Sequence, residues 1–265
     1  MTKPIDRLCS AAKAFGAAPQ ESPALPEEGP RELRSAANAF NRTREQIRGH
    51  LDERNRMIAA LAHDLRTPLT KLQLRLARVE PETLRNQLAE PAKGMNAILT
   101  QGLKFARSLR TEEPMTKVDL PSFLQSLADD YADLGRAVTF ECDSALEANP
   151  QTGILPARPL CLKRCMENLL TNACAYAGSA EIRLTAEKEA LVVTVSDRGP
   201  GIPEELLEKV FEPYFRVEGS RNRASGGTGL GLAIARNMAQ LNGAALSLAN
   251  RPGGGLVVTL RFRRP

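Results

Sequence analysis

The chain has 265 residues, which is long for one domain and enough for two or three. Hydrophobic residues make up 42% and aromatic residues only 4%, so we expect a core built on Leu, Val, Ile and Ala. The net charge of +5 comes from basic residues spread along the chain. This disfavours a nucleic-acid-binding protein and fits a mildly basic solvated surface, or one that lies close to anionic lipid.

The sequence contains neither a long apolar run nor a signal peptide, so no membrane span is expected within it. Its Cys residues are odd in number and form no CxxC pair, which is typical of free thiols in a reducing cytosol. Cys161 and Cys165 are four residues apart on one predicted helix face. Without a nearby second pair of Cys or His, we interpret them as buried small hydrophobes rather than a metal site.

The first half of the chain has a helical pattern. A short amphipathic stretch, Ile5 to Phe15, is followed by a connector rich in Pro, Ala and Glu from Ala17 to Pro30 and by a helix from Arg31. Apolar residues recur at heptad spacing along this helix, which predicts helix–helix packing in a parallel dimer. These residues are Leu33, Phe40, Ile47, Leu51, Ile58, Leu65, Leu72 and Val79.

A turn near Glu80–Pro81 is predicted to end that helix, and a second helix should follow to about Leu109. Two such hairpins would form a four-helix bundle. Pro91 and Gly94 predict a kink or a late start in the second helix.

From about Val118 the pattern mixes helices with short strands, which indicates an α+β sandwich. The predicted helices are 121–134, 160–177 and 230–241, with a short helical stretch at 204–210. The predicted strands are 138–142, 180–186, 191–197, 245–249 and 256–262.

The segment around His63 carries the first chemical constellation. In the heptad register His63 falls at an outward position, and Thr67 lies four residues on, on the same face. Asp64 can hydrogen-bond one ring nitrogen of His63 and raise the nucleophilicity of the other. Pro68 removes a backbone donor, so the helix should bend just past His63. An idle surface His remains the alternative if this segment is taken alone.

Three further constellations point to a bound anion and a cation. Asn168 and Asn172 share a helix face, and their amide oxygens suit Mg²⁺. Asp197 ends an apolar strand and precedes Gly199 and Gly201, which allow close backbone approach. The glycine run 225–231 opens a helix, where backbone amides favour phosphate. Taken singly, these segments leave alternatives open. The Asn pair could cap the helix, and Asp197 could mark a plain strand-to-turn exit. The glycine run neither follows a strand as a Rossmann fingerprint does nor carries the Lys of a P-loop.

Together and in this order, these segments resemble the sensor histidine kinases of two-component systems, over nearly the whole chain. The matching boxes are residues 61–70 (LAHDLRTPLT, H box), 164–176 (RCMENLLTNACAY, N box), 197–203 (DRGPGIP, G1 box), 211–216 (FEPYFR, F box) and 225–235 (SGGTGLGLAIA, G2 box). The wording HDLRTPLT and DRGPGIP, with NAIL at 96–99, is most similar to the EnvZ type.

The resemblance implies a multidomain architecture. Residues 1–49 would be a HAMP linker, 50–112 a dimerisation and histidine phosphotransfer hairpin, and 113–265 a catalytic ATP-binding domain of the GHKL type. HAMP linkers normally follow a transmembrane helix, so the resemblance implies the cytoplasmic portion of a bacterial inner-membrane protein with a missing N-terminal transmembrane segment. A homodimer is expected.

The resemblance also implies a reaction. ATP would donate its γ-phosphoryl group to His63, with Asp64 beside it, and the phosphohistidine would pass the group to an aspartate of a separate response regulator. Thr67 resembles the residue that positions water for dephosphorylating the regulator. Asn172 would bind Mg²⁺, and Asp197 would accept the adenine amine. The implied nucleotide-binding residues are Asn168, Asn172, Tyr176, Asp197, Gly199, Gly201, Phe215, Arg216, Gly227, Thr228, Gly229, Leu230 and Gly231.

One position departs from the family pattern. The family usually carries Lys or Arg three residues after the second N-box Asn, where this chain has Ala175. Arg216 and a lid formed by the stretch from Phe211 to Arg223 with the glycine run are expected to supply the positive potential.

Two other classes of protein stay open. One is a signalling scaffold that binds ATP without phosphorylating His63. The other is a GHKL-type ATPase without a phosphohistidine, although those ATPases carry a catalytic Glu where this chain has Asn168.

Overall fold

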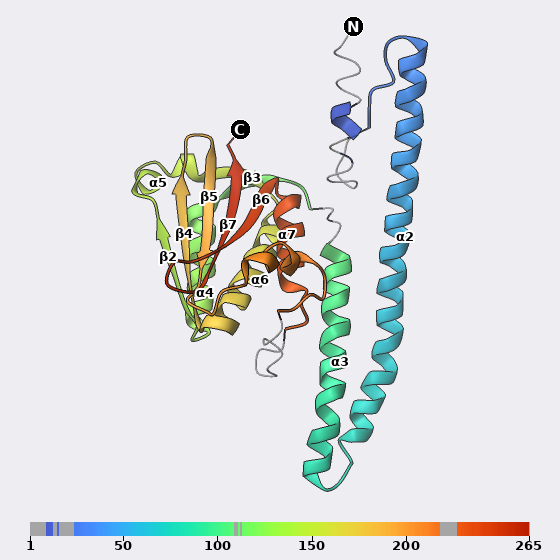
Figure 1. Ribbon diagram of the computed structural model, residues 1–265, viewed down its shortest axis with the longest axis vertical. Helices are drawn as coiled ribbons and strands as arrows, with labels where there is room; N and C mark the ends of the chain where they lie inside the picture. Colours follow the sequence, from blue (N-terminus) through green and yellow to red (C-terminus); the bar gives the residue numbers. More distant parts are fainter. Residues whose placement is uncertain are drawn as a thin grey trace. The chain divides into compact units, whose positions relative to one another are not determined.

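The computed structural model describes residues 9–12, 15, 24–108, 111, 113–217 and 227–264 (Figure 1). The chain divides into two compact units, residues 1–74 and residues 75–265. Much of the predicted amphipathic stretch from Ile5 and of the connector from Ala17 lies outside the described residues. No helix among the described residues is both long and apolar enough to cross a membrane.

The first unit is built on one long helix. Helix α2 (Arg31–Leu76) runs for 46 residues and continues through Pro68, which confirms the helix predicted from Arg31. The Asn41 side chain fixes the preceding segment along it: Leu25 N donates to Asn41 Oδ1 at 2.9 Å, and Asn41 Nδ2 donates to Leu25 O at 3.0 Å. The Asn41 amide thus binds both backbone polar groups of Leu25 and holds the segment before the helix against it.

The second unit begins with the last residues of α2 and with helix α3 (Glu82–Ser108). Glu82 opens α3, and Pro91 lies inside it, so the predicted late start of this helix is wrong. Of the helix's hydrogen bonds, Pro91 removes only the one that its own amide would have donated, which a long helix tolerates. The turn predicted at Glu80–Pro81 separates the two helices.

A five-stranded sheet forms the centre of the remaining residues, in the order β2-β4-β5-β7-β6. Strand β2 runs parallel to β4, and the other neighbours are antiparallel. These strands are β2 (Ala137–Cys142), β4 (Ser179–Ala186), β5 (Ala190–Ser196), β6 (Ala244–Asn250) and β7 (Leu256–Arg263). All five were predicted from the sequence, each to within two residues.

Several short elements were not predicted. Strands β1 (Thr116–Asp119) and β3 (Ile154–Ala157) form a separate antiparallel pair. The others are α5 (Ser144–Ala148) and the 3-10 turn η1 (Pro150–Gly153). The helical stretch expected near residues 204–210 forms two 3-10 turns, η2 (Glu204–Leu206) and η3 (Lys209–Phe211).

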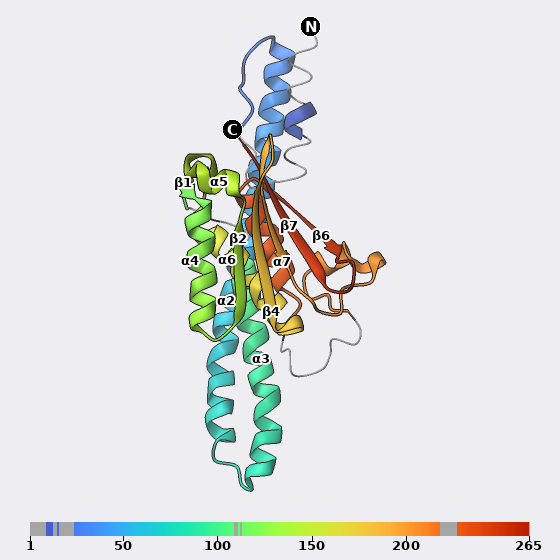
Figure 2. The ribbon, with the colours of Figure 1, turned by 90° about the vertical axis from the view of Figure 1, so that its left-hand side faces the viewer.

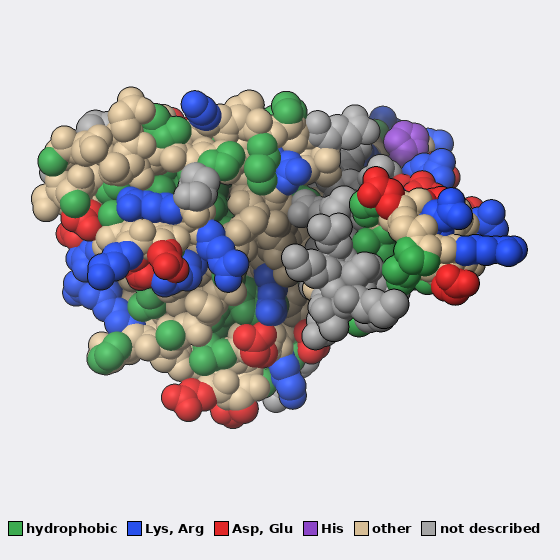
Figure 3. All heavy atoms as spheres, turned by 90° about the horizontal axis from the view of Figure 1, so that it is seen from above, with side chains coloured by type: hydrophobic (Ala, Val, Ile, Leu, Met, Phe, Trp, Pro, Cys, Tyr) green, Lys and Arg blue, Asp and Glu red, His purple; other side chains and the backbone are tan. Residues whose placement is uncertain are grey.

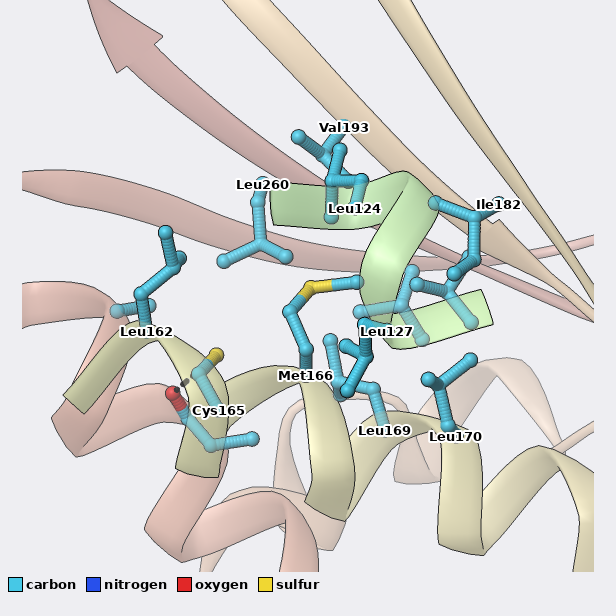
Figure 4. Close-up of a cluster of buried hydrophobic side chains, with 14 of the residues drawn as sticks. Leu124, Leu127, Leu162, Cys165, Met166, Leu169, Leu170, Ile182, Val193 and Leu260 are labelled. Carbon is cyan, nitrogen blue, oxygen red and sulfur yellow. Dashed lines mark hydrogen bonds between the residues drawn. The ribbon is translucent and has the colours of Figure 1, made fainter. Parts of the chain in front are cut away.

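Helices α4 (Leu120–Asp133), α6 (Pro159–Ala177) and α7 (Gly231–Leu241) cover one face of the sheet (Figures 1 and 2). Their apolar stripes meet the inward residues of the strands, and Figure 4 shows Met166 and Leu169 of α6 close to Leu127 of α4. Burial of such side chains contributes about 1.5 to 3 kcal/mol each. The two-layer core holds α6 in place, and α6 carries much of the candidate site.

Charged side chains of both signs are scattered over the face of this unit that Figure 3 shows. On the face shown in Figure 3, Lys and Arg lie beside Asp and Glu rather than in a separate basic field. Arg183 pairs with Glu141 at 2.6 Å across neighbouring strands, and Arg236 pairs with Glu208 at 3.2 Å. This distribution agrees with the mildly basic solvated surface expected from composition.

Candidate functional site

The second unit contains a cavity of about 1210 Å³. It is lined by α6, by the loop after β5, by residues 215–217 and by the glycine-rich segment that opens α7. Gln101 and Ser108 of α3 also line it. Three of the predicted constellations therefore meet at one hollow, although they lie between residues 164 and 231 of the sequence.

Helix α6 presents Asn168, Asn172 and Tyr176 to the cavity. Their spacing of four places them in one row, because a helix turns once in 3.6 residues. Asn168 Nδ2 donates to the carbonyl of Arg164 at 2.7 Å, which fixes the amide orientation. Asn168 Oδ1 then faces the start of α7, 3.7 Å from where a side chain on Gly231 would begin.

Asp197 lies at the end of β5 and organises the loop that follows. Its Oδ1 accepts from Gly199 N at 2.8 Å and from Leu256 N at 3.2 Å. No described residue donates to Oδ2, so this oxygen is available to a ligand in the cavity. Gly255 passes so close that a Cβ there would lie 2.0 Å from Asp197 O, which only glycine permits.

Asn250, at the end of β6, was not identified from the sequence. Its Oδ1 accepts from Ile202 N at 2.9 Å, and its Nδ2 donates to Ile202 O at 2.6 Å. The amide thus holds the loop that contains Gly201, and a Cβ on Gly201 would lie 2.8 Å from Asn250 Oδ1. No local pattern marks this residue, because its partner is 48 positions away.

The glycine-rich segment is held by its own backbone geometry. Gly229 has a φ of +75°, and a Cβ there would lie 2.7 Å from Phe215 O, so a larger residue does not fit. Gly229 O accepts from Tyr214 N at 3.0 Å. Thr228 Oγ1 donates to Gln101 Oε1 of α3. This segment leads directly into α7.

Helix α7 begins without a side-chain cap, since Leu230 at the N-cap position makes no such hydrogen bond. The first backbone amides of the helix therefore have no acceptor from the N-cap side chain. Gly231 and Leu232 of this first turn line the cavity, where the helix dipole favours an anion. Leu230, which was also predicted to bind the nucleotide, is fully buried and does not line the cavity. Gly227, Thr228, Gly229 and Gly231 line the cavity.

Phe215 and Arg216 line the cavity opposite α6. They follow η3, where Phe211 is buried and stacks under the Arg236 guanidinium at 4.4 Å. The remainder of the predicted lid, residues 218–226, lies outside the described residues. What the structure describes is therefore the two anchored ends of that stretch.

The His63 segment belongs to the other unit. The His63 side chain is 77% exposed, and its Nδ1 lies 3.3 Å from Asp64 Oδ1. Thr67 is exposed as well. The Asp64 carboxylate lies beside Nδ1, so the other ring nitrogen, Nε2, is left open to solvent.

The thiols of the second unit have a structural role. Cys161, Cys165 and Cys174 are buried, which confirms the interpretation of Cys161 and Cys165 as small hydrophobes. Burial raises the pKa of the Cys165 thiol to about 12, and the thiol donates to Ala235 O at 3.3 Å. Among the described residues, no three His, Cys, Asp or Glu side chains gather where they could hold a metal ion.

The arrangement matches known proteins. Residues 157–265 match the family described as histidine kinase-, DNA gyrase B-, and HSP90-like ATPase. Over 99% of its length the chain is 39% identical to the sensor histidine kinase GtrS of Pseudomonas aeruginosa. The chain is thus similar to sensor histidine kinases over nearly its whole length, and residues 157–265 match the ATPase family found in them. It spans about half the length of the curated relatives that it matches, with 53% of GtrS covered.

Two solved histidine kinase structures share the fold of this chain. Full-length ShkA in complex with AMPPNP has a TM-score of 0.57 and 20% identity, over 78% of this chain and 45% of ShkA. ThkA in complex with the response regulator protein TrrA has a TM-score of 0.53 and 24% identity, over 82% of this chain and 64% of ThkA. The α/β part of the chain thus has the fold of the GHKL-type ATP-binding domain that was predicted from its boxes.

Proposed function

We propose that the chain is an ATP-dependent protein-histidine kinase of the EnvZ type. ATP binds in the cavity of the second unit, its γ-phosphoryl group passes to His63, and the phosphohistidine donates it to an aspartate of a separate response regulator. The observation that carries the proposal is the pairing of a nucleotide-type cavity with an exposed His63 whose ring contacts Asp64 at 3.3 Å. Positioning and charge neutralisation supply most of the catalysis in phosphoryl transfer.

The cavity fits an adenine nucleotide from end to end. Asp197 Oδ2 is placed to accept the exocyclic amine of the base, while Oδ1 keeps the loop in place through two backbone amides. The uncapped start of α7 and the glycine-rich segment offer amides to the phosphates. Tyr176 and Phe215 provide apolar surface along the lining, and Arg216 provides a positive charge.

Mg²⁺ would be held by the Asn amide oxygens together with the ATP phosphates. Asn168 Oδ1 faces the start of α7, and Asn172 lies one turn further along α6. Mg²⁺ is commonly bound through few protein oxygens when phosphates complete its shell. The residues therefore fit this ion, with Asn172 as the main ligand.

The first 49 residues form a HAMP linker in this proposal, followed by the dimerisation and phosphotransfer hairpin (50–112) and the catalytic domain (113–265). The kinase is a homodimer and the cytoplasmic portion of a bacterial inner-membrane protein. The apolar heptad positions of α2 support the dimer, because Leu61 and Leu65 are 56% and 52% exposed in the single chain.

The test uses radiolabelled ATP with the 265-residue chain and its His63→Ala variant. The proposal predicts acid-labile label on the unmodified chain and none on the variant, with ATP binding equal in both. Absence of His63-dependent label despite ATP binding would favour the signalling scaffold. Rapid ATP turnover by the His63→Ala variant would favour the GHKL-type ATPase.

A regulator phosphatase activity is a second function of the same segment. Thr67 is exposed one turn after His63 on the same helix, where it can position a water molecule. Thr67→Ala should leave autophosphorylation unchanged and slow the dephosphorylation of the phosphorylated regulator. The measurement is the rate at which the labelled regulator loses its label. Equal loss of both activities would rule out this role.

A further inference from the structure

Arg164 occupies a position on α6 that the proposed roles do not use. It precedes Asn168 by four residues, so Arg164, Asn168, Asn172 and Tyr176 form one row along the helix, and all four line the cavity. We propose that Arg164 binds the terminal phosphates of the nucleotide and supplies the positive charge that Ala175 does not. This inference rests on the proposed ATP-binding function.

The row on α6 has a base end and a phosphate end. At one end, Tyr176 O lies 3.4 Å from where a Cβ on Gly199 would be, next to Asp197. Further along, Asn168 Oδ1 faces Gly231 at the start of α7, where the amides favour an anion. Arg164 lies one helical turn, about 5.4 Å, beyond Asn168 on the side away from Asp197. A triphosphate that extends from a base at Asp197 therefore points toward Arg164.

The charges around the cavity make Arg164 important. Among the described residues, four charged ones line it: the cations Arg164 and Arg216 and the anions Glu167 and Asp197. Without Arg164 the described part of the lining would carry an excess of negative charge, which opposes an anionic ligand. A guanidinium also presents two parallel donors to phosphate oxygens, which an amine does not.

Arg164 is also available for this role. Its side chain is exposed, and among the described residues no carboxylate pairs with it. The adjacent Lys163 behaves differently: its Nζ pairs with Asp130 Oδ2 at 3.5 Å, and it does not line the cavity. Lys163 is therefore a control of equal charge and similar exposure, placed one residue away.

The experiment compares Arg164→Gln with Lys163→Gln in the whole chain, by calorimetric titration with ATP and with adenosine. Arg164→Gln should weaken ATP binding by about tenfold to a hundredfold, the effect of a charged hydrogen bond, and leave adenosine binding unchanged. Lys163→Gln should leave both unchanged. Adding Ala175→Lys to Arg164→Gln should recover part of the lost ATP affinity.

Three results would overturn the inference: ATP affinity in Arg164→Gln equal to that of Lys163→Gln, an equal loss for ATP and adenosine, or no recovery with Ala175→Lys. An equal loss would mean that Arg164 only supports the fold of α6. Failure of the unmodified chain to bind ATP would instead contradict the proposed function. The two failures are therefore distinguishable.

Discussion

At Asp197 a single carboxylate holds the fold and leaves an oxygen for a ligand. Its Oδ1 satisfies two backbone amides, of Gly199 and Leu256, which would otherwise be left without an acceptor. Its Oδ2 faces no donor among the described residues. Because Oδ1 binds the backbone and Oδ2 is left for a ligand, a substitution can change the ligand contact and keep the structural hydrogen bonds.

Asp197→Asn should keep the structural bonds and lose recognition. The Asn oxygen can still accept from both amides, but an NH₂ group replaces the acceptor Oδ2 and opposes the adenine amine. We expect ATP affinity to fall by about tenfold to a hundredfold with little change in melting temperature. ITP, which lacks the exocyclic amine, should bind both proteins with similar affinity. An ATP affinity that the substitution leaves unchanged would place the base elsewhere.

Because its thiol is buried, Cys165 should make the free energy of unfolding fall at alkaline pH. Burial raises its pKa to about 12 in the folded chain, so folding favours the protonated thiol. This contribution is complete below the pKa of an exposed thiol, near about 8.5, and is lost as the pH rises toward about 12. From about pH 8 to about pH 10.5, urea unfolding of the unmodified chain should lose about 2 kcal/mol more than that of Cys165→Ala. Equal losses of unfolding free energy in the two proteins would show that burial does not raise the pKa of the Cys165 thiol.

At the scale of elements, the sequence predicted the helices and strands that carry strong periodicity. Helix α6 and the five strands of the main sheet have apolar patterns of sufficient length, and their residues were assigned correctly. Strands β1 and β3 have only four residues each, and α5 has five, too few for a period to show. The parallel pairing of β2 with β4 depends on the α6 crossover and not on local pattern.

Some residues of the candidate site could also be predicted from local sequence, and others could not. Asp197, Asn168 and the glycine-rich segment were found because each lies in a local motif. Asn250 was missed because its role arises only when β6 and the loop at Ile202 come together. Arg164 is the first residue of the N box, but the sequence does not show that it lines the cavity. That became clear only from the placement of α7 beside α6.

The apolar stripe of α2 predicts self-association. Leu65 is 52% exposed at a heptad position, whereas Thr70 falls at an outward one. Leu65→Glu should convert a dimer into a monomer in light scattering after size-exclusion chromatography, because a buried unpaired carboxylate costs several kcal/mol. Thr70→Glu, the control, should stay dimeric, and ATP affinity should be unchanged in both. A dimeric Leu65→Glu would place the interface elsewhere.

At the scale of the whole molecule, the chemistry is divided between two compact units. The first carries His63 with Asp64 and Thr67, and the second carries the cavity and the row from Arg164 to Tyr176. In the proposed reaction the phosphoryl group passes from a nucleotide in the second unit to His63 in the first, so the reaction requires both units.

The most direct measurement is the location of the phosphoryl group after incubation with Mg-ATP, mapped by mass spectrometry under neutral conditions that preserve phosphohistidine. The account predicts a phosphoryl group on His63 in the unmodified chain and its strong reduction in Asp197→Asn, whose fold is retained. His50, the second His of the sequence, should carry none. A phosphoryl group on another residue, or on His63 to the same extent in Asp197→Asn, would contradict the account.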